Sequence, residues 1–285
     1  MTNVQNRILL FIIALPALAL IILFLPYGHY AAINGLAILV IGIGAMETGG
    51  IFSRRGASVS LRACFILGAA PAAITYAGYL YEAPGLSPVF FFIAAALILL
   101  AREIFHHREE DFQQVLPRLG AYFFILLYPG LFGVYVVRLT ELPNAEAVFT
   151  LFVAATYLND SCAWLTGVLW GKHTRNILVV SPNKSLVGFA GGFFASIIVV
   201  AGCSLIWPRF FPLSLPRAAV LGAALGLTTI FGDLAESSLK RSAGVKDSGA
   251  LIPGRGGLLD SIDSPLFNAP VFFYLFSVLT GGPVF

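Results

Sequence analysis

Long apolar runs, separated by short polar segments, are the dominant pattern along the chain. A helix needs about 20 mostly apolar residues to cross the hydrocarbon core of a bilayer. Strand-like alternation is absent, and the runs are too long for the strands of a membrane barrel. The pattern therefore predicts nine membrane-spanning helices, at residues 8–25, 31–52, 61–80, 87–105, 119–140, 146–171, 185–207, 217–237 and 265–281.

The composition supports this prediction. Hydrophobic residues make up 58% of the chain and charged residues 11%, whereas soluble domains are about a quarter charged. We therefore expect an all-α, polytopic helical bundle that forms one membrane domain over residues 1–285. Residues 1–140 would supply the N-terminal helices, and residues 141–285 the helices and loops of the active site. The first run is too long for a cleaved signal peptide, so we expect it to be retained as a helix.

The distribution of positive charge predicts the orientation. If the N-terminus is cytoplasmic and the nine helices alternate, 14 of the 17 Lys and Arg residues fall on the inner side. The outer side receives only Arg138, Arg209 and Arg217. This asymmetry follows the positive-inside rule. The net charge of +3 is small, and no basic patch with interleaved aromatic residues suggests nucleic acid.

A polar face is expected at the end of the eighth predicted helix. Asp233, Glu236, Ser237 and Lys240 follow an i, i+3, i+4, i+7 spacing, which places them on one helical face. Carboxylates within an apolar span are costly and generally mark an ion pathway, a metal site or a substrate site. The structural alternative is an intrahelical pair of Glu236 and Lys240.

Three further aspartates, Asp247, Asp260 and Asp263, are expected in the loop that follows. Aspartates mixed with Lys and Arg suit metal-assisted phosphate chemistry, because Mg²⁺ is commonly held by one or two carboxylates and substrate phosphates. The glycines of "PGRGG" permit positive φ and a close approach of the backbone to a phosphate.

The stretch "SLKRSAGVKDSGALIPGRGGLLDSID" resembles the signature of the phosphatidate cytidylyltransferases, also called CDP-diacylglycerol synthases. The stretches "GDLAES" and "SPNKSLVG", and the pattern that begins at Asn159 and ends at Lys172, are similar to the same family. The matches in the signature itself are Ser238, Lys240, Arg241, Lys246, Asp247, Gly249, Pro253, Gly254, Gly256, Gly257, Asp260 and Asp263.

The resemblance implies condensation of CTP with phosphatidic acid to give CDP-diacylglycerol and pyrophosphate. It implies one or two Mg²⁺ ions held by Asp233, Asp260 and Asp263. The catalytic residues that it implies are Asp233, Lys240, Lys246, Asp247, Asp260 and Asp263. The substrate-binding residues that it implies are Asp160, Lys172, Ser181, Lys184, Ser185, Glu236, Ser237, Arg241, Gly254, Arg255, Gly256 and Gly257.

The chain departs from the family pattern at three positions. Arg255 replaces a histidine and cannot titrate near neutral pH, although it can still bind phosphate. Ser261 replaces an arginine and so loses a bidentate phosphate contact. Val187 replaces a glutamate. These changes predict altered activity or a somewhat different substrate.

Several alternatives stay open at this stage. Asp160, with Asn159, either makes a polar contact between helices or lines a substrate cavity. Glu47, Arg102 and Glu103 are expected to be interfacial or helix-pairing charges. Rival functions are another CTP-dependent lipid enzyme, of the CDP-archaeol synthase or polyprenol kinase type, and a cation-coupled transporter. We expect the protein in the cell inner membrane, in contact with the lipid bilayer and with its active site on the cytoplasmic side. A homodimer is an open alternative.

Overall fold

A computed structural model describes residues 16–83, 88–105, 109–252 and 256–282, and for residues 109–111 it describes the backbone alone. Eight helices within these residues are long and apolar enough to cross a membrane, which confirms the predicted polytopic bundle. Residues 16–24 are also helical, but much of the first predicted span lies outside the described residues. The eight helices are Tyr27–Arg54, Leu61–Leu80, Pro88–Phe105, Phe112–Glu141, Ala145–Leu169, Leu186–Ile206, Leu215–Ser242 and Leu259–Thr280.

The last two helices differ from the prediction at their polar ends. Helix α9 (Leu215–Ser242) extends five residues beyond the predicted end. Helix α10 (Leu259–Thr280) begins six residues before the predicted start. The expectation that Asp260 and Asp263 lie in a loop is therefore wrong, since both belong to the first turns of α10. An acidic residue such as Asp260 favours the first turn of a helix, so the helix begins before its apolar part.

The chain divides into two compact units. The first comprises residues Met1–Arg138 and Ser242–Ile262, and the second comprises Leu139–Arg241 and Asp263–Phe285.

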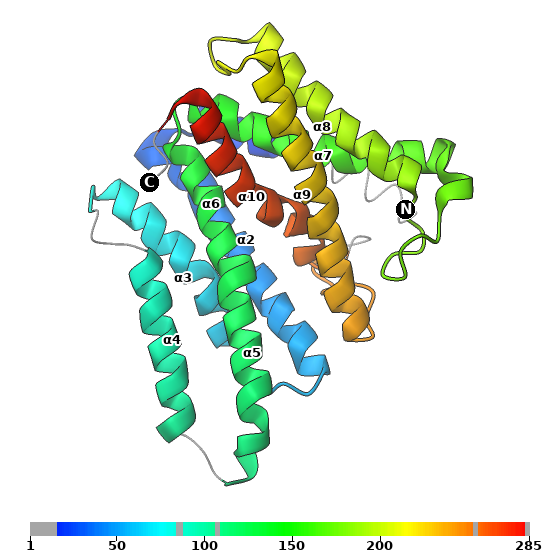
Figure 1. Ribbon diagram of the computed structural model, residues 1–285. Helices are drawn as coiled ribbons and strands as arrows, with labels where there is room; N and C mark the ends of the chain where they lie inside the picture. The colour runs from blue at the N-terminus through cyan, green and yellow to red at the C-terminus, as the bar shows by residue number, and fades with distance from the viewer. Residues whose placement is uncertain (1–15, 84–87, 106–108, 253–255, 283–285) are drawn as a thin grey trace. The chain divides into compact units, whose positions relative to one another are not determined.

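In the first unit, α2 (Tyr27–Arg54) packs along α3 (Leu61–Leu80). Small residues allow this close approach: Gly68 faces Ala45, and Gly49 faces Cys64. Helices α4 (Pro88–Phe105) and α5 (Val115–Ile125) follow as antiparallel neighbours (Figure 1). A short 3₁₀ turn, η1 (Glu109–Gln114), precedes α5, and a π-helical turn, η2 (Leu126–Leu131), joins it to α6 (Phe132–Arg138).

The π-helical turn has a local cause. Pro129 lies inside η2, and proline has no N–H with which to continue the regular ladder of an α-helix. A π-turn accommodates one such interruption without ending the helix. The rod from α5 to α6 is therefore long enough to serve as one span.

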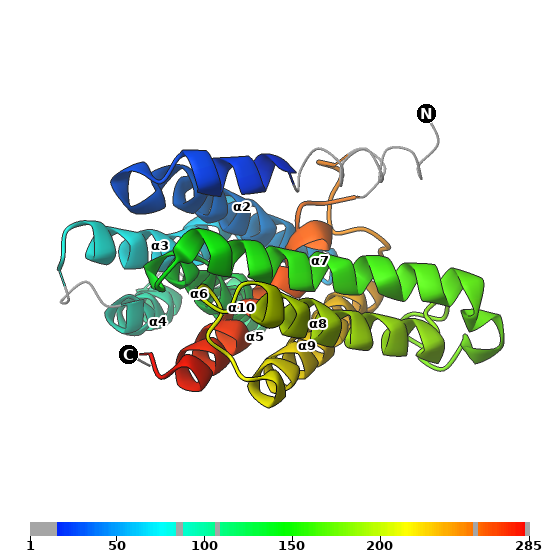
Figure 2. The same cartoon turned by 90° about the horizontal axis from the view of Figure 1, so that it is seen from above.

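In the second unit, α7 (Ala145–Leu169) and α8 (Leu186–Ile206) lie side by side as an antiparallel pair (Figure 2). The turn η3 (Leu139–Glu141) precedes α7, and the turn η4 (Gly171–Thr174) follows it. The side chain of Asn268 on α10 joins three helices, since its amide donates to Thr156 Oγ1 of α7 at 2.8 Å and to Thr229 Oγ1 of α9 at 2.7 Å. This network satisfies buried polar atoms in the middle of apolar helices.

A buried ion pair connects α4 and α5 in the first unit. Arg118 donates two parallel hydrogen bonds to Glu103, from Nε to Oε1 at 2.8 Å and from Nη2 to Oε2 at 2.5 Å. Both side chains are about nineteen-twentieths buried. Glu103 on α4 therefore pairs with a neighbouring helix, as the helix-pairing interpretation expected.

Arg118→Met should lower the thermal stability of the protein in detergent, because it leaves the Glu103 carboxylate buried without its cation. Breaking a buried pair costs roughly 3–5 kcal/mol. The double variant Glu103→Leu/Arg118→Met, which removes both charges, should recover much of this loss. Thermal unfolding of the three proteins measures the difference, and a double variant less stable than Arg118→Met would contradict the interpretation.

Candidate active site

Helix α9 places the predicted acidic and basic residues on one face within the second unit. Glu236 Oε2 accepts an ion-paired contact from Lys240 Nζ at 2.5 Å, one helical turn away. The Glu236 side chain is 1% exposed and that of Lys240 is 11% exposed. The intrahelical pair given above as the structural alternative is therefore present, and its burial places it among packed helices instead of on a solvated surface.

Lys184 reaches α9 from the loop before α8 and donates to Asp233 Oδ2. The next residue, Ser185, is the N-cap of α8, because its Oγ accepts from the backbone N–H of Gly188 at 3.0 Å. The cap fixes the backbone at Ser185, and thereby the position of the Lys184 backbone from which the side chain extends toward α9. Ser185 itself is 3% exposed, and its expected substrate contact stays a prediction.

The electrostatic surroundings of Lys184 bring further predicted residues together. Burial lowers the pKa of Lys184 from 10.5 to about 8, while the negative charges of Asp263 and Asp160 act in the opposite direction. Lys184 is therefore mostly charged at neutral pH. The charge of Lys240 also lowers the pKa of Lys184, and that of Glu236 raises it.

We call this group the α9 cluster: Asp160, Lys184, Asp233, Glu236, Lys240 and Asp263. It holds four carboxylates and two ammonium groups, all from the second unit. The excess of acidic groups favours a bound cation, and the two lysines favour an anion. The cluster therefore suits a ligand that carries both, such as a metal-bound phosphate.

The first unit contains the glycine-rich segment, residues 248–258, of which 253–255 lie outside the described residues. Asp260 Oδ2 accepts hydrogen bonds from Ser248 N at 2.9 Å, Ser248 Oγ at 2.8 Å and Gly257 N at 2.7 Å. An antiparallel bridge between Ile252 and Gly256 closes the turn. Asp260 thus ties the start of α10 to the segment that precedes it.

Gly256 has a positive φ, which the sequence analysis expected of the glycines in this segment. Its φ is +108°, and a Cβ there would lie 2.7 Å from Asp260 Oδ2 and 2.8 Å from the Cβ of Asp247. Another residue would therefore be strained and crowded. Lys246 and Asp247 are exposed. The predicted residues Gly254 and Arg255 lie outside the described residues.

Glu47 of α2 is the residue that sequence reasoning missed. Its carboxylate accepts from Leu258 N at 3.0 Å, Leu259 N at 2.7 Å and Ser248 Oγ at 3.0 Å. Glu47 thus binds the glycine-rich segment, a role that the expectation of an interfacial or helix-pairing charge did not include. The signal available in the sequence was a lone carboxylate inside an apolar run.

The remaining predicted residues take different positions. Asn159 makes the polar contact between helices, because its Nδ2 donates to Ser196 Oγ of α8 at 2.9 Å. Its neighbour Asp160 belongs to the α9 cluster instead. Ser237 is buried. Lys172 and Arg241 are exposed and Ser181 is half-buried, so their expected substrate contacts stay predictions.

The proposed metal ligands fall in both units. Asp233 and Asp263 belong to the second unit, and Asp260 belongs to the first. Among the described residues, no group of three or more His, Cys, Asp or Glu side chains is arranged to hold a metal ion. Two carboxylates and substrate phosphates are nevertheless a common Mg²⁺ environment, and the donor chemistry of Asp233 and Asp263 fits it.

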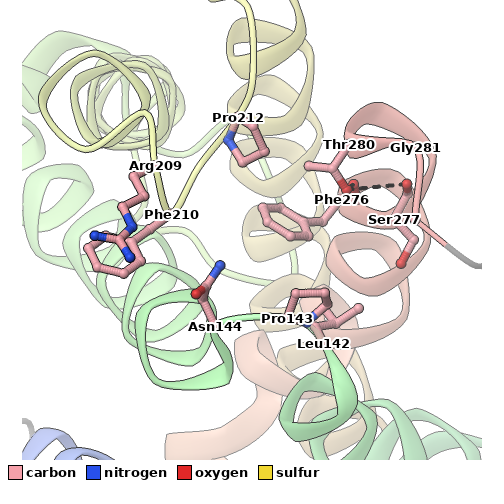
Figure 3. A pocket seen from close by; sticks show the side chains of 11 residues that line it. Leu142, Pro143, Asn144, Arg209, Phe210, Pro212, Phe276, Ser277, Thr280 and Gly281 are labelled. Atoms are coloured by element: carbon pink, nitrogen blue, oxygen red, sulfur yellow. Dashed lines mark hydrogen bonds between the residues drawn. The ribbon is translucent and has the colours of Figure 1, made fainter.

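A separate cavity of about 180 Å³ lies at the other end of the second unit (Figure 3). It is formed by the N-terminal end of α7, the α8–α9 connection and the C-terminal end of α10, whereas the α9 cluster lies near the α7–α8 connection. It is therefore distinct from the predicted site. Its lining residues are Leu142, Pro143, Asn144, Arg209, Phe210, Pro212, Phe276, Ser277, Thr280, Gly281 and Gly282.

Comparison with known proteins gives a family match over nearly the whole chain, because a sequence profile of the cytidylyltransferase family matches residues 5–279. The phosphatidate cytidylyltransferase of Thermotoga maritima is 35% identical over 177 residues, which make up 61% of this chain and 64% of that protein. The phosphatidate cytidylyltransferase of Synechocystis sp. is 39% identical over 137 residues, or 48% of this chain and 45% of that protein.

The uncharacterised protein YnbB of Escherichia coli is also similar, with 43% identity over 135 residues, 47% of this chain and 44% of that protein. The chain therefore spans between about two fifths and two thirds of the length of these curated relatives. Membership of a family follows from the full-length match, whereas a particular reaction does not.

Proposed function

The chain belongs to the cytidylyltransferase family, and from this premise we propose that it is a CTP:phosphatidate cytidylyltransferase of phospholipid biosynthesis. It would condense CTP with phosphatidic acid to form CDP-diacylglycerol and pyrophosphate. The observation that carries the proposal is the α9 cluster, in which Lys184 and Lys240 lie among four carboxylates at one end of an apolar bundle. Two of the relatives are named for this activity.

The reaction is mainly an electrostatic problem. A phosphate monoester has a second pKa near 6, so the lipid phosphate is largely a dianion at neutral pH and needs no strong base. One of its oxygens attacks the α-phosphorus of CTP, the bond from that phosphorus to the bridging α–β oxygen breaks, and pyrophosphate leaves. Lys184 and Lys240 would bind phosphate oxygens and so reduce the repulsion between the two anions.

The acidic residues would serve a cation. We propose that Asp233 and Asp263 hold Mg²⁺, and the participation of Asp260, with a second metal ion, stays a prediction from the sequence. A metal ion held there would neutralise charge on the phosphate oxygens and on the departing pyrophosphate. Glu236 would keep Lys240 charged and oriented through their contact at 2.5 Å.

The membrane setting suits the two substrates. Phosphatidic acid stays in the bilayer, whereas CTP arrives from water, so the site has to be reached from both. The chain is a multi-pass membrane protein, and we propose the inner membrane, with the α9 cluster on the cytoplasmic side. The basic residues of the α7–α8 connection, Lys172, Arg175 and Lys184, support this side. A homodimer stays a prediction.

The reaction is tested with purified protein, phosphatidic acid, Mg²⁺ and CTP labelled at the α-phosphorus. We expect the label in the lipid product and release of pyrophosphate in equal amount. A lipid kinase would transfer the γ-phosphate instead, and a lipid other than phosphatidic acid as the sole acceptor would point to a related CTP-dependent enzyme. Cation-driven solute uptake into proteoliposomes without CTP consumption would point to a transporter.

The proposed side of the membrane is tested in the same assay with sealed vesicles. CTP cannot cross the bilayer, so inverted vesicles should convert added CTP, and right-side-out vesicles should do so only after permeabilisation. Turnover confined to intact right-side-out vesicles would contradict a cytoplasmic site.

Lys184→Met should raise the KM for CTP by roughly tenfold or more, because a charge-assisted hydrogen bond to phosphate contributes about 1.5–3 kcal/mol. Lys184→Arg keeps the charge and should retain more affinity. Arg175→Met, at an exposed position of the same connection, is the matched control. Equal KM values for Lys184→Met and the control would exclude Lys184 from CTP binding.

Asp263→Asn should raise the Mg²⁺ concentration needed for half-maximal rate by roughly 10- to 100-fold, since it removes one proposed ligand. The rate is measured over a Mg²⁺ series at saturating CTP. Glu146→Gln on α7, a carboxylate of the same unit in the first turn of that helix, should leave the Mg²⁺ series unchanged. An unchanged Mg²⁺ requirement in Asp263→Asn would remove this residue from the metal site.

A further inference from the structure

The carboxylate of Glu47 binds the backbone at the start of α10, more than 200 residues away in the chain. Oε1 accepts from Leu258 N at 3.0 Å, and Oε2 accepts from Leu259 N at 2.7 Å. The first N–H groups of an α-helix have no acceptor within the helix. Because α10 begins at Leu259, Glu47 satisfies backbone donors at the very start of this helix, and its negative charge lies where the helix dipole favours it.

Ser248 connects this interaction to Asp260. Its Oγ lies 3.0 Å from Glu47 Oε2 and 2.8 Å from Asp260 Oδ2. A hydroxyl has one proton, so it donates to one carboxylate at a time while remaining beside both. The backbone N–H of Ser248 also donates to Asp260 at 2.9 Å. Glu47, Ser248 and Asp260 thus form a continuous chain of contacts within the first unit.

Two glycines of the segment leave room for the Glu47 carboxylate. A Cβ on Gly249 would overlap Glu47 Oε1, and a Cβ on Gly257 would overlap Glu47 Oε2. Gly249 and Gly257 come from the two sides of the turn closed by Ile252 and Gly256. Described residues on both sides of this bridge therefore pack against the carboxylate, which explains the glycine at each position by close approach.

We propose that Glu47 is a positioning residue for the reaction: it anchors the glycine-rich segment and the start of α10, and thereby sets the orientation of Asp260. It acts through the backbone and Ser248, without contacting substrate. The catalytic part of this inference rests on the proposed function, whereas the anchoring part does not. A small misplacement of a catalytic group is enough to reduce the rate strongly.

The anchoring is tested by hydrogen–deuterium exchange of the full-length protein in detergent. Glu47→Gln is nearly isosteric, but it replaces one of the two accepting oxygens with an NH₂ group. That group cannot accept a hydrogen bond from the backbone N–H that it faces. We expect amides in peptides covering residues 248–260 to exchange about tenfold faster or more. Thr48→Val is the matched control, because Thr48 is buried on the same helix and its hydroxyl bonds to Gly44 O. Unchanged exchange in Glu47→Gln would overturn the anchoring.

The catalytic part is tested by kinetics on the same samples. Glu47→Gln should lower kcat by roughly 10- to 100-fold, with a smaller change in the KM for CTP, while the unfolding temperature stays near that of Thr48→Val. Faster exchange with an unchanged kcat would overturn the catalytic part. If the wild-type protein shows no turnover, the proposed function fails, and exchange alone still decides the anchoring.

A second variant keeps the test decisive if Glu47→Gln does not fold. Ser248→Ala removes the hydroxyl between Glu47 and Asp260. It keeps the backbone hydrogen bonds from Leu258 and Leu259 to Glu47 and from Ser248 N to Asp260. It should increase exchange over residues 248–260 and lower kcat in the same direction as Glu47→Gln, by a smaller factor. Wild-type exchange and kcat in Ser248→Ala would overturn the connection through Ser248.

Discussion

A carboxylate within an apolar helical bundle is stable only where a cation or several hydrogen-bond donors surround it, because its desolvation is costly. This protein meets the constraint in different ways. Glu103 has a bidentate arginine, Glu236 has a lysine one turn away on its own helix, and Glu47 has two backbone amides and a hydroxyl. These contacts connect α4 to α5 and α2 to the start of α10, and one of them joins successive turns of α9.

The same constraint separates structural from functional charge. Glu103 and Arg118 form a buried, bidentate ion pair, in which the cation lies directly against the carboxylate. The α9 cluster differs, since four carboxylates lie among two lysines and the residues come from a loop and three helices. Such a concentration of charge is costly in an apolar bundle, and the proposed ligands, Mg²⁺ and substrate phosphates, would lower that cost.

Hydropathy predicted the spans well because the length of an apolar run is fixed by the thickness of the bilayer. The run at 61–80 coincides with α3. Hydropathy failed at the start of α10, where polar residues such as Asp260 and Asp263 form helical turns before the apolar part begins. The spacing on α9 was sufficient to predict that Glu236 and Lys240 share a face, since both lie on one regular helix.

Pairings across the chain were beyond the reach of a single sequence. Nothing in the local pattern connects Lys184 to Asp233 or Glu47 to Leu259, because these contacts depend on how helices pack and not on their periodicity. Glu47 was visible as a charge in an apolar run, but its partners are mainly backbone amides, and every residue except proline carries one. The sequence therefore indicated that a partner was needed without indicating which one.

Lys184 and Asp233 neutralise each other through their direct contact. While this contact persists, neither side chain is available to an ion from solution. An anion that bound Lys184 would leave the Asp233 carboxylate free to bind a cation, and a cation on Asp233 would leave Lys184 free to bind an anion. By thermodynamic reciprocity each proposed ligand would then strengthen the binding of the other, so this one contact would make their binding cooperative.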